Sequence, residues 1–151
     1  MKRRGFTLVE LAIVIAILGI LAMYAIPKYQ GMVEEARSAQ ARAQLGTFRS
    51  ALAIYYAKNG GKFPSLTTVQ GGGIFAEGTV PYVEVTKSDN SVVKSNAVAN
   101  GGSTVPIPST TIQDVGGWIY AVTSDSAQAD VRINSKGTDP AASTTTYWYQ
   151  Y

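Results

Sequence analysis

The chain has 151 residues, no cysteine, no histidine and a formal net charge of +3. Without cysteine no disulfide forms, and without histidine or another base beside a serine or threonine no catalytic constellation is evident. Three of the 13 basic residues, Lys2, Arg3 and Arg4, precede the first element, and the remaining ten balance the ten acidic residues. We therefore expect neither an enzyme nor a general nucleic-acid-binding surface.

The first predicted element is an apolar helix over residues 6–26, in which Glu10 is the only charged residue. A bilayer-spanning helix takes about 20 apolar residues, and the basic residues before this one place the N-terminus in the cytoplasm. A cleaved secretory signal fits less well, because Met23 occupies the minus-three position if Ala25 is minus one. A plain membrane anchor leaves Glu10 unexplained, since a carboxylate in hydrocarbon costs about 3 kcal/mol.

The junction between the basic leader and the apolar run reads GFTLVE over residues 5–10. It resembles the signature of type IV pilins and of the pseudopilins of type II secretion, and the match extends closely to about residue 30. The resemblance implies that a membrane-embedded prepilin peptidase cuts between Gly5 and Phe6 on the cytoplasmic side, and that the new amine of Phe6 is N-methylated. The leader, residues 1–5, is then lost and the apolar helix stays.

Glu10 gains a partner under this interpretation, because the positive amine of Phe6 lies one helical turn away. Each charge is costly alone in lipid, and pairing relieves both costs. The resemblance implies that the amine of an incoming subunit meets Glu10 of a subunit already in place, which sets the register of assembly. Thr7 adds a hydrogen bond. The alternative is a carboxylate at headgroup level that reaches water unpaired.

Gly19 and Pro27 both weaken the predicted helix. Glycine costs about 1 kcal/mol relative to alanine, and proline removes a backbone hydrogen bond. The resemblance places them at positions between which family members often lose helicity in filaments, so residues 19–27 are a candidate melting segment. A simple kink where the helix leaves the bilayer is the alternative.

A second, amphipathic helical stretch is predicted over residues 28–59, following the transmembrane and assembly helix of residues 6–27. Gly60 and Gly61 follow Asn59 and end it, because these residue types tolerate the left-handed conformation. One stripe must pack on the C-terminal part of the chain. Its predicted members recur at spacings of about three and four residues: Tyr29, Val33, Ala36, Ala41, Leu45, Phe48, Leu52 and Tyr55.

Residues 60–115 are rich in Gly, Pro, Ser and Thr, and the resemblance makes them a variable connector between helix and sheet. Short strands are predicted at residues 80–86 and 91–98. Residues 116–151 form the predicted sheet region, an antiparallel sheet of three or four strands. Its clearest strands are residues 118–123, 129–134 and 145–151.

The predicted class is therefore α+β, a long N-terminal helix packed on a small C-terminal antiparallel sheet, as in the pilin fold. Alternation along the last strand places its tyrosines on one face and its tryptophan on the other. Those tyrosines are either ordinary sheet packing or a patch at a filament surface or subunit interface. They are Tyr147, Tyr149 and Tyr151, opposite Trp148.

Asp125, Asp130 and Asp139 raise the question of a calcium site, because calcium takes about six to eight oxygen ligands. Major pseudopilins, which this chain resembles in size and layout, bind calcium in their C-terminal region. The three aspartates lack a dedicated ligand spacing, so solvated loop carboxylates are the preferred interpretation. No other cofactor is expected.

The resemblance implies a structural subunit made as a single-pass precursor in the inner or cytoplasmic membrane. A prepilin peptidase and an inner-membrane assembly platform then convert it into a homo-oligomeric helical filament. We favour a major type IV pilin in an extracellular pilus, serving adhesion, twitching motility or DNA uptake. A major pseudopilin of a type II secretion system, in the periplasm, is the first alternative, since many pilins close their C-terminal region with a disulfide. A plain anchored binding domain is the second.

Overall fold

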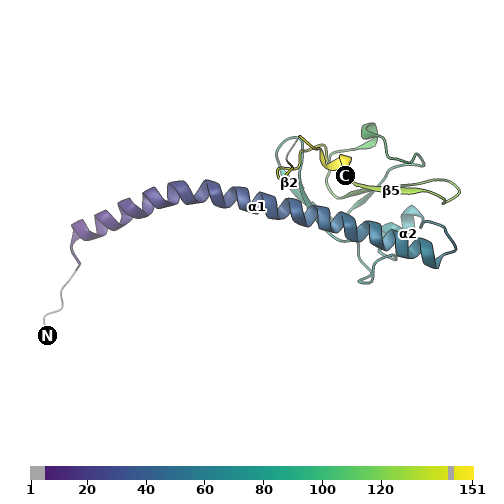
Figure 1. Cartoon of the computed structure of the whole chain (residues 1–151), viewed down its shortest axis with the longest axis horizontal. Coiled ribbons are helices and arrows are strands. Elements are labelled where there is room, and N and C mark those ends of the chain that lie inside the picture. The colour runs from purple at the N-terminus through teal and green to yellow at the C-terminus, as the bar shows by residue number, and fades with distance from the viewer. Residues whose placement is uncertain (1–5, 143–144) are drawn as a thin grey trace. The chain divides into compact units, whose positions relative to one another are not determined.

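The computed structural model describes residues 6–142 and 145–151. It divides into two units, Met1–Glu35 and Ala36–Tyr151, which are described separately. One helix, α1, spans Leu8–Lys58 and contributes to both units (Figure 1). Its bounds lie within two residues of the predicted helix, and the predicted α+β class is confirmed.

The first unit consists of the N-terminal part of α1, whose large apolar side chains are exposed. Leu8 is 87% exposed and Met23 is 81% exposed, and the first buried residue of α1 is Ser38. Tyr29, Val33 and Ala36 were predicted to belong to the buried stripe. That part of the prediction is wrong, because these residues precede Ser38 and are exposed.

In the second unit, α1 buries a stripe spaced at three and four residues, as predicted for its core members. Within this stripe, the ring of Phe48 lies 5.1 Å from the rings of both Trp118 and Phe75. These contacts join the helix to the sheet and to the connector. The buried members are Ser38, Ala41, Leu45, Phe48 and Leu52.

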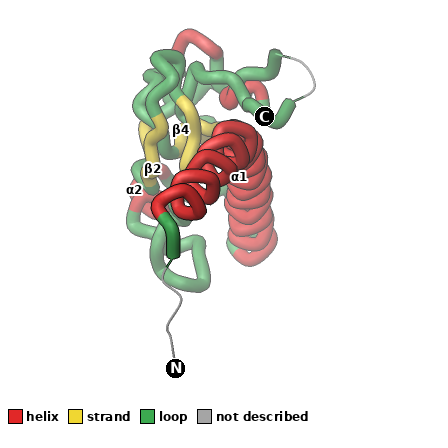
Figure 2. Tube along the Cα trace, turned by 90° about the vertical axis from the view of Figure 1, so that its left-hand side faces the viewer, coloured by secondary structure: helices red, strands yellow, loops and turns green. Residues whose placement is uncertain are grey.

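The connector holds more regular structure than its composition predicts. A short helix, α2 (Leu66–Gln70), is capped by the side chain of Ser65, and a 3₁₀ turn, η1, covers Ser109–Thr111. A hairpin of β1 (Val83–Thr86) and β2 (Val92–Ser95) forms a separate two-stranded antiparallel sheet. Loops and turns make up the remainder of the connector (Figure 2).

The main sheet has three strands in the order β3 (Val98–Asn100), β4 (Trp118–Val122) and β5 (Ala129–Ile133). The β4–β5 pair is antiparallel, as predicted, but β3 pairs with β4 in parallel. The sheet is therefore mixed. The predicted strand over residues 91–98 is wrong in that its residues divide between β2 and β3, in two different sheets.

The central strand β4 is buried on both faces, because each face packs on its own apolar cluster. Trp118 and Tyr120 face the cluster that contains the helix stripe, and Ile119 and Ala121 face a second cluster with Ile107. The polar atoms are paired as well. The indole of Trp118 donates to the carbonyl of Pro81 at 2.8 Å, and the hydroxyl of Tyr120 donates to the carbonyl of Pro64 at 2.8 Å.

The predicted strand over residues 145–151 is wrong. A single bridge joins Thr138 to Tyr147, and Trp148–Gln150 then form a 3₁₀ helix, η2. The amide of Tyr147 donates to the Gln150 side chain at 2.7 Å. In a strand, the same amide would donate to a neighbouring strand.

The predicted faces of this last segment also differ from those observed. The rings of Tyr147 and Tyr149 stack at 5.5 Å with an interplanar angle of 12°. The ring of Tyr151 instead lies beside that of Trp148 at 6.0 Å. The helical turn of η2 explains the change, because it removes the two-residue alternation of a strand.

Candidate functional site

The start of α1 is closed by Thr7 and Glu10, which form a capping box. Thr7 precedes the first helical residue, and its hydroxyl accepts from the amide of Glu10 at 3.2 Å. In return, Oε2 of Glu10 accepts from the amide of Thr7 at 2.9 Å. Two amide groups that the helix leaves unpaired are thereby satisfied.

Both hydrogen bonds to the Glu10 carboxylate use the same oxygen. The hydroxyl of Thr7 also donates to Oε2, at 2.8 Å. The other oxygen, Oε1, accepts no hydrogen bond from any of the described residues. Glu10 therefore completes the helix start and leaves its second carboxylate oxygen without a donor among the described residues.

Phe6 lies directly before this cap and is 80% exposed. In the uncut chain its nitrogen belongs to a peptide bond, so only cleavage after Gly5 makes it an amine that attracts Glu10. Gly5 and the rest of the predicted leader, residues 1–5, lie outside the described residues. The predicted processing site is thus described on its Phe6 side.

Gly19 and Pro27 both lie inside α1, which is helical throughout Leu8–Lys58. A Cβ added at Gly19 would have nothing within 4 Å, so packing within the chain does not require glycine there. Among the described helices, only α1 is long and apolar enough to cross a membrane, judged by length and composition. The melting of residues 19–27 stays a prediction.

The three candidate calcium ligands lie in separate hydrogen-bonded settings. Asp125, in the turn between β4 and β5, accepts from the Thr123 hydroxyl at 2.5 Å, which lowers the pKa of its carboxyl. Asp130 accepts from the Nε of Arg132 at 2.8 Å. Within the described part of the chain, no group of three or more acidic, histidine or cysteine side chains is placed to hold a metal ion.

Asp139, the third candidate, instead ties the C-terminal segment to α1. Its fully buried side chain accepts from the hydroxyl of Tyr151 at 2.7 Å and lies 3.4 Å from the Nε of Arg42. Burial opposes ionisation, but these contacts and the amide of Ala141 lower the pKa of Asp139 below its ordinary value. We call these contacts the Asp139 clasp. Arg49 adds to it by donating to the carbonyl of Tyr151.

Sequence reasoning found Thr7 and Glu10 but missed their capping box and the clasp. The pattern of a threonine followed three residues later by glutamate, before an apolar run, is the signal that predicts a capping box. Nothing local predicts the clasp, because Arg42 and Asp139 lie far apart in the sequence.

A family model described as the prokaryotic N-terminal methylation motif matches residues 1–26. The fimbrial protein EcpC of Eikenella corrodens is 40% identical over 108 residues, which are 72% of this chain and 65% of that protein. A fimbrial protein of Neisseria meningitidis is 37% identical over 98 residues, 65% of this chain and 57% of the relative. No solved structure matches the chain.

A shorter match is the type IV narrow pilus major component PilA5 of Thermus thermophilus, 46% identical over 54 residues, or 36% of this chain and 47% of that protein. The chain spans 65% or less of the length of these curated relatives. All three matches join relatives named for fimbriae or pili to a chain that opens with a methylation motif. This motif and these relatives support placing the chain in the type IV pilin superfamily.

Proposed function

We propose that this chain is the major structural subunit of a type IV pilus-like filament. A prepilin peptidase cuts after Gly5, Phe6 is N-methylated, and an inner-membrane platform assembles the subunits through their N-terminal helices. The precursor crosses the membrane once with its N-terminus in the cytoplasm, and the mature chain lies in an extracellular filament.

The observation that carries this proposal is the hydrogen bonding of the Glu10 carboxylate. Its Oε1 accepts no hydrogen bond from the residues that the structure describes, and it lies at the start of a helix whose large apolar side chains are exposed in the chain alone. Lipid covers that surface in the precursor, and like helices cover it in a filament. A positive Phe6 amine from a neighbouring chain suits the open oxygen, because an uncompensated charge in an apolar setting is costly.

Two further points support the pilin reading over its alternatives. The relatives are named fimbrial proteins and major pilins, which favours a pilin over a pseudopilin. A plain anchored binding domain has no use for an acidic residue with an open oxygen at this depth. Within the filament, residues 19–27 lose helicity on extension, because Gly19 and Pro27 weaken that part of α1.

The test is to shear cells, separate filaments from membranes, and measure the mass of the N-terminal peptide in each fraction. We expect a methylated Phe6 terminus in the sheared filaments. The same terminus confined to the membrane would indicate a pseudopilin or a minor subunit. An intact Met1 start in both fractions would overturn the proposal and leave a plain anchor.

A further inference from the structure

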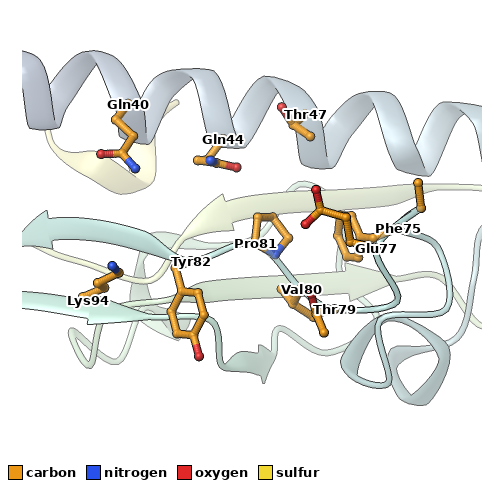
Figure 3. Close-up of a pocket in the computed structure, with 11 residues that line it drawn as sticks. Gln40, Gln44, Thr47, Phe75, Glu77, Thr79, Val80, Pro81, Tyr82 and Lys94 are labelled. Carbon is orange, nitrogen blue, oxygen red and sulfur yellow. The ribbon is translucent and has the colours of Figure 1, made fainter.

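A groove runs along α1 in the second unit, between the helix and residues 73–82 of the connector. It consists of two cavities of about 590 Å³ and 530 Å³ that share Thr47, Phe75 and Ala76 as lining residues. Its walls carry exposed apolar side chains, since Ile54 is 55% exposed and Tyr82 is 54% exposed. We call the two cavities together the helix groove, and Figure 3 shows the first of them.

Three charged residues line the helix groove: Glu77, Lys94 and Lys58. Along the axis of α1, Figure 3 shows Lys94 toward Gln40 and Glu77 toward Thr47, and Lys58 follows at the end of the helix. The charges therefore alternate as plus, minus and plus.

These groove charges lack partners of opposite sign. Among the described residues, Glu77 and Lys58 make no ion pair and no side-chain hydrogen bond, whereas Lys94 lies 5.6 Å from the ring centroid of Tyr82. An unpaired anion between two cations on an apolar wall favours an occupant with the opposite arrangement of charge.

The first unit carries a cation followed by two anions, which is opposite in sign to Glu77 followed by Lys58 in the helix groove. Beyond Glu10, its charged residues within the described part are Lys28, Glu34 and Glu35, and none of them forms an ion pair there. The cation precedes the two anions by about 9 to 11 Å along the helix. Exposed apolar side chains lie between them, including Tyr29 and Met32, which are 69% and 61% exposed.

We propose that the helix groove receives residues 28–35 of a second copy of this chain, with Lys28 opposite Glu77. Glu34 and Glu35 then face Lys58. This inference rests on the proposed function. Copies that enter one membrane in the same orientation pack with their helices parallel, and the parallel direction places Lys28 before the two glutamates along the groove. Thr47, toward which Glu77 lies, is about 16 Å from Lys58 along α1. This distance exceeds the spacing between Lys28 and the two glutamates, and the flexible stem of Lys58 covers the difference.

The cysteine-free chain allows a direct test by crosslinking. Filaments of a Lys28→Cys, Glu77→Cys double variant are oxidised, sheared from cells and run on a non-reducing gel. We expect a ladder of disulfide-linked multimers. The matched control is Lys28→Cys with Lys136→Cys, because Lys136 is exposed but does not line the groove. Filaments that give no ladder, or an equal ladder in the control, would overturn the proposal.

A charge-swap series decides the question if the cysteine variant does not assemble. Lys28→Glu and Glu77→Lys each reduce the yield of sheared filaments severalfold, and combining them restores most of it. A double variant that stays as low as the singles would contradict the pairing. The unmodified chain separates the two proposals. If it forms filaments but filaments of the double-cysteine variant contain no link between positions 28 and 77, the groove alone is rejected. If the unmodified chain forms no filaments, the proposed function is rejected as well.

Discussion

Glu10 caps the helix within its own chain and, in our proposal, pairs with a charge on another chain. Each role uses a different carboxylate oxygen. Oε2 closes the capping box with Thr7, while Oε1 accepts no hydrogen bond within residues 6–142 and 145–151. A glutamine at this position keeps the box, because Gln serves as well as Glu at the third helical residue. Alanine removes both the box and the charge. The two substitutions therefore separate helix capping from charge pairing.

We expect Glu10→Gln and Glu10→Ala both to abolish sheared filaments while the precursor remains in the membrane. The charge is lost in each variant, and without it the Phe6 amine of a neighbouring chain stays unpaired in lipid. Immunoblots of the sheared and membrane fractions measure the effect. Normal filament yield from Glu10→Gln would contradict the pairing role, and loss in Glu10→Ala alone would assign the residue to capping.

Tyr120 is a second residue whose polar atom has a testable effect, here on the stability of the fold. Its ring is buried, burial raises the pKa of its hydroxyl, and the hydroxyl donates to the carbonyl of Pro64. We expect Tyr120→Phe to lower the free energy of unfolding by about 1–3 kcal/mol, because the Pro64 carbonyl stays buried and unpaired. Chemical denaturation measures this change. Tyr82→Phe, at an exposed ring, is the control and should cost little.

At the scale of elements, the Asp139 clasp joins α1 to the last turn of the chain. Because the folded pKa of Asp139 lies below its ordinary value, the clasp stabilises the fold above the unfolded pKa of about 3.9. That stability is lost as the pH falls through the lower folded pKa.

We therefore expect Asp139→Asn to be less stable than the unmodified chain at neutral pH by about 1–3 kcal/mol. The difference should shrink below about pH 4, where the unmodified chain loses the same ionic contacts. Thermal unfolding of the detergent-solubilised chain, followed at several pH values, measures it. A difference that stays constant between neutral and acidic pH would assign the loss to packing.

The elements also separate what local sequence predicts from what it does not. The helix stripe from Ala41 to Leu52 and the strand β5 follow from periodicity, because each buries one repeating face. The strand β4, which is buried on both faces, follows instead from its continuous apolar run. The parallel β3–β4 pair does not, since it depends on a contact across the connector. Residues 145–151 alternate like a strand, and the hydrogen bond from Tyr147 to Gln150 turns them into η2 instead.

For the molecule as a whole, the described residues contain no cluster of metal ligands, and we expect the stability of the fold not to depend on a metal ion. Asp125, Asp130 and Asp139 are each occupied by protein donors. We expect a chelator to leave the thermal midpoint of unfolding unchanged. A fall in the midpoint that calcium alone reverses would contradict this expectation and favour the pseudopilin alternative, with magnesium as the control ion.

Both tryptophans of the chain lie in the second unit, and both are buried. Trp118 packs against Phe48, and Trp148 belongs to the last turn beside Tyr151. Intrinsic tryptophan fluorescence therefore reports on that unit and is blind to the apolar N-terminal helix. A single optical signal can follow the unfolding of the globular part in membranes, in detergent and in filaments, whatever happens to residues 6–35.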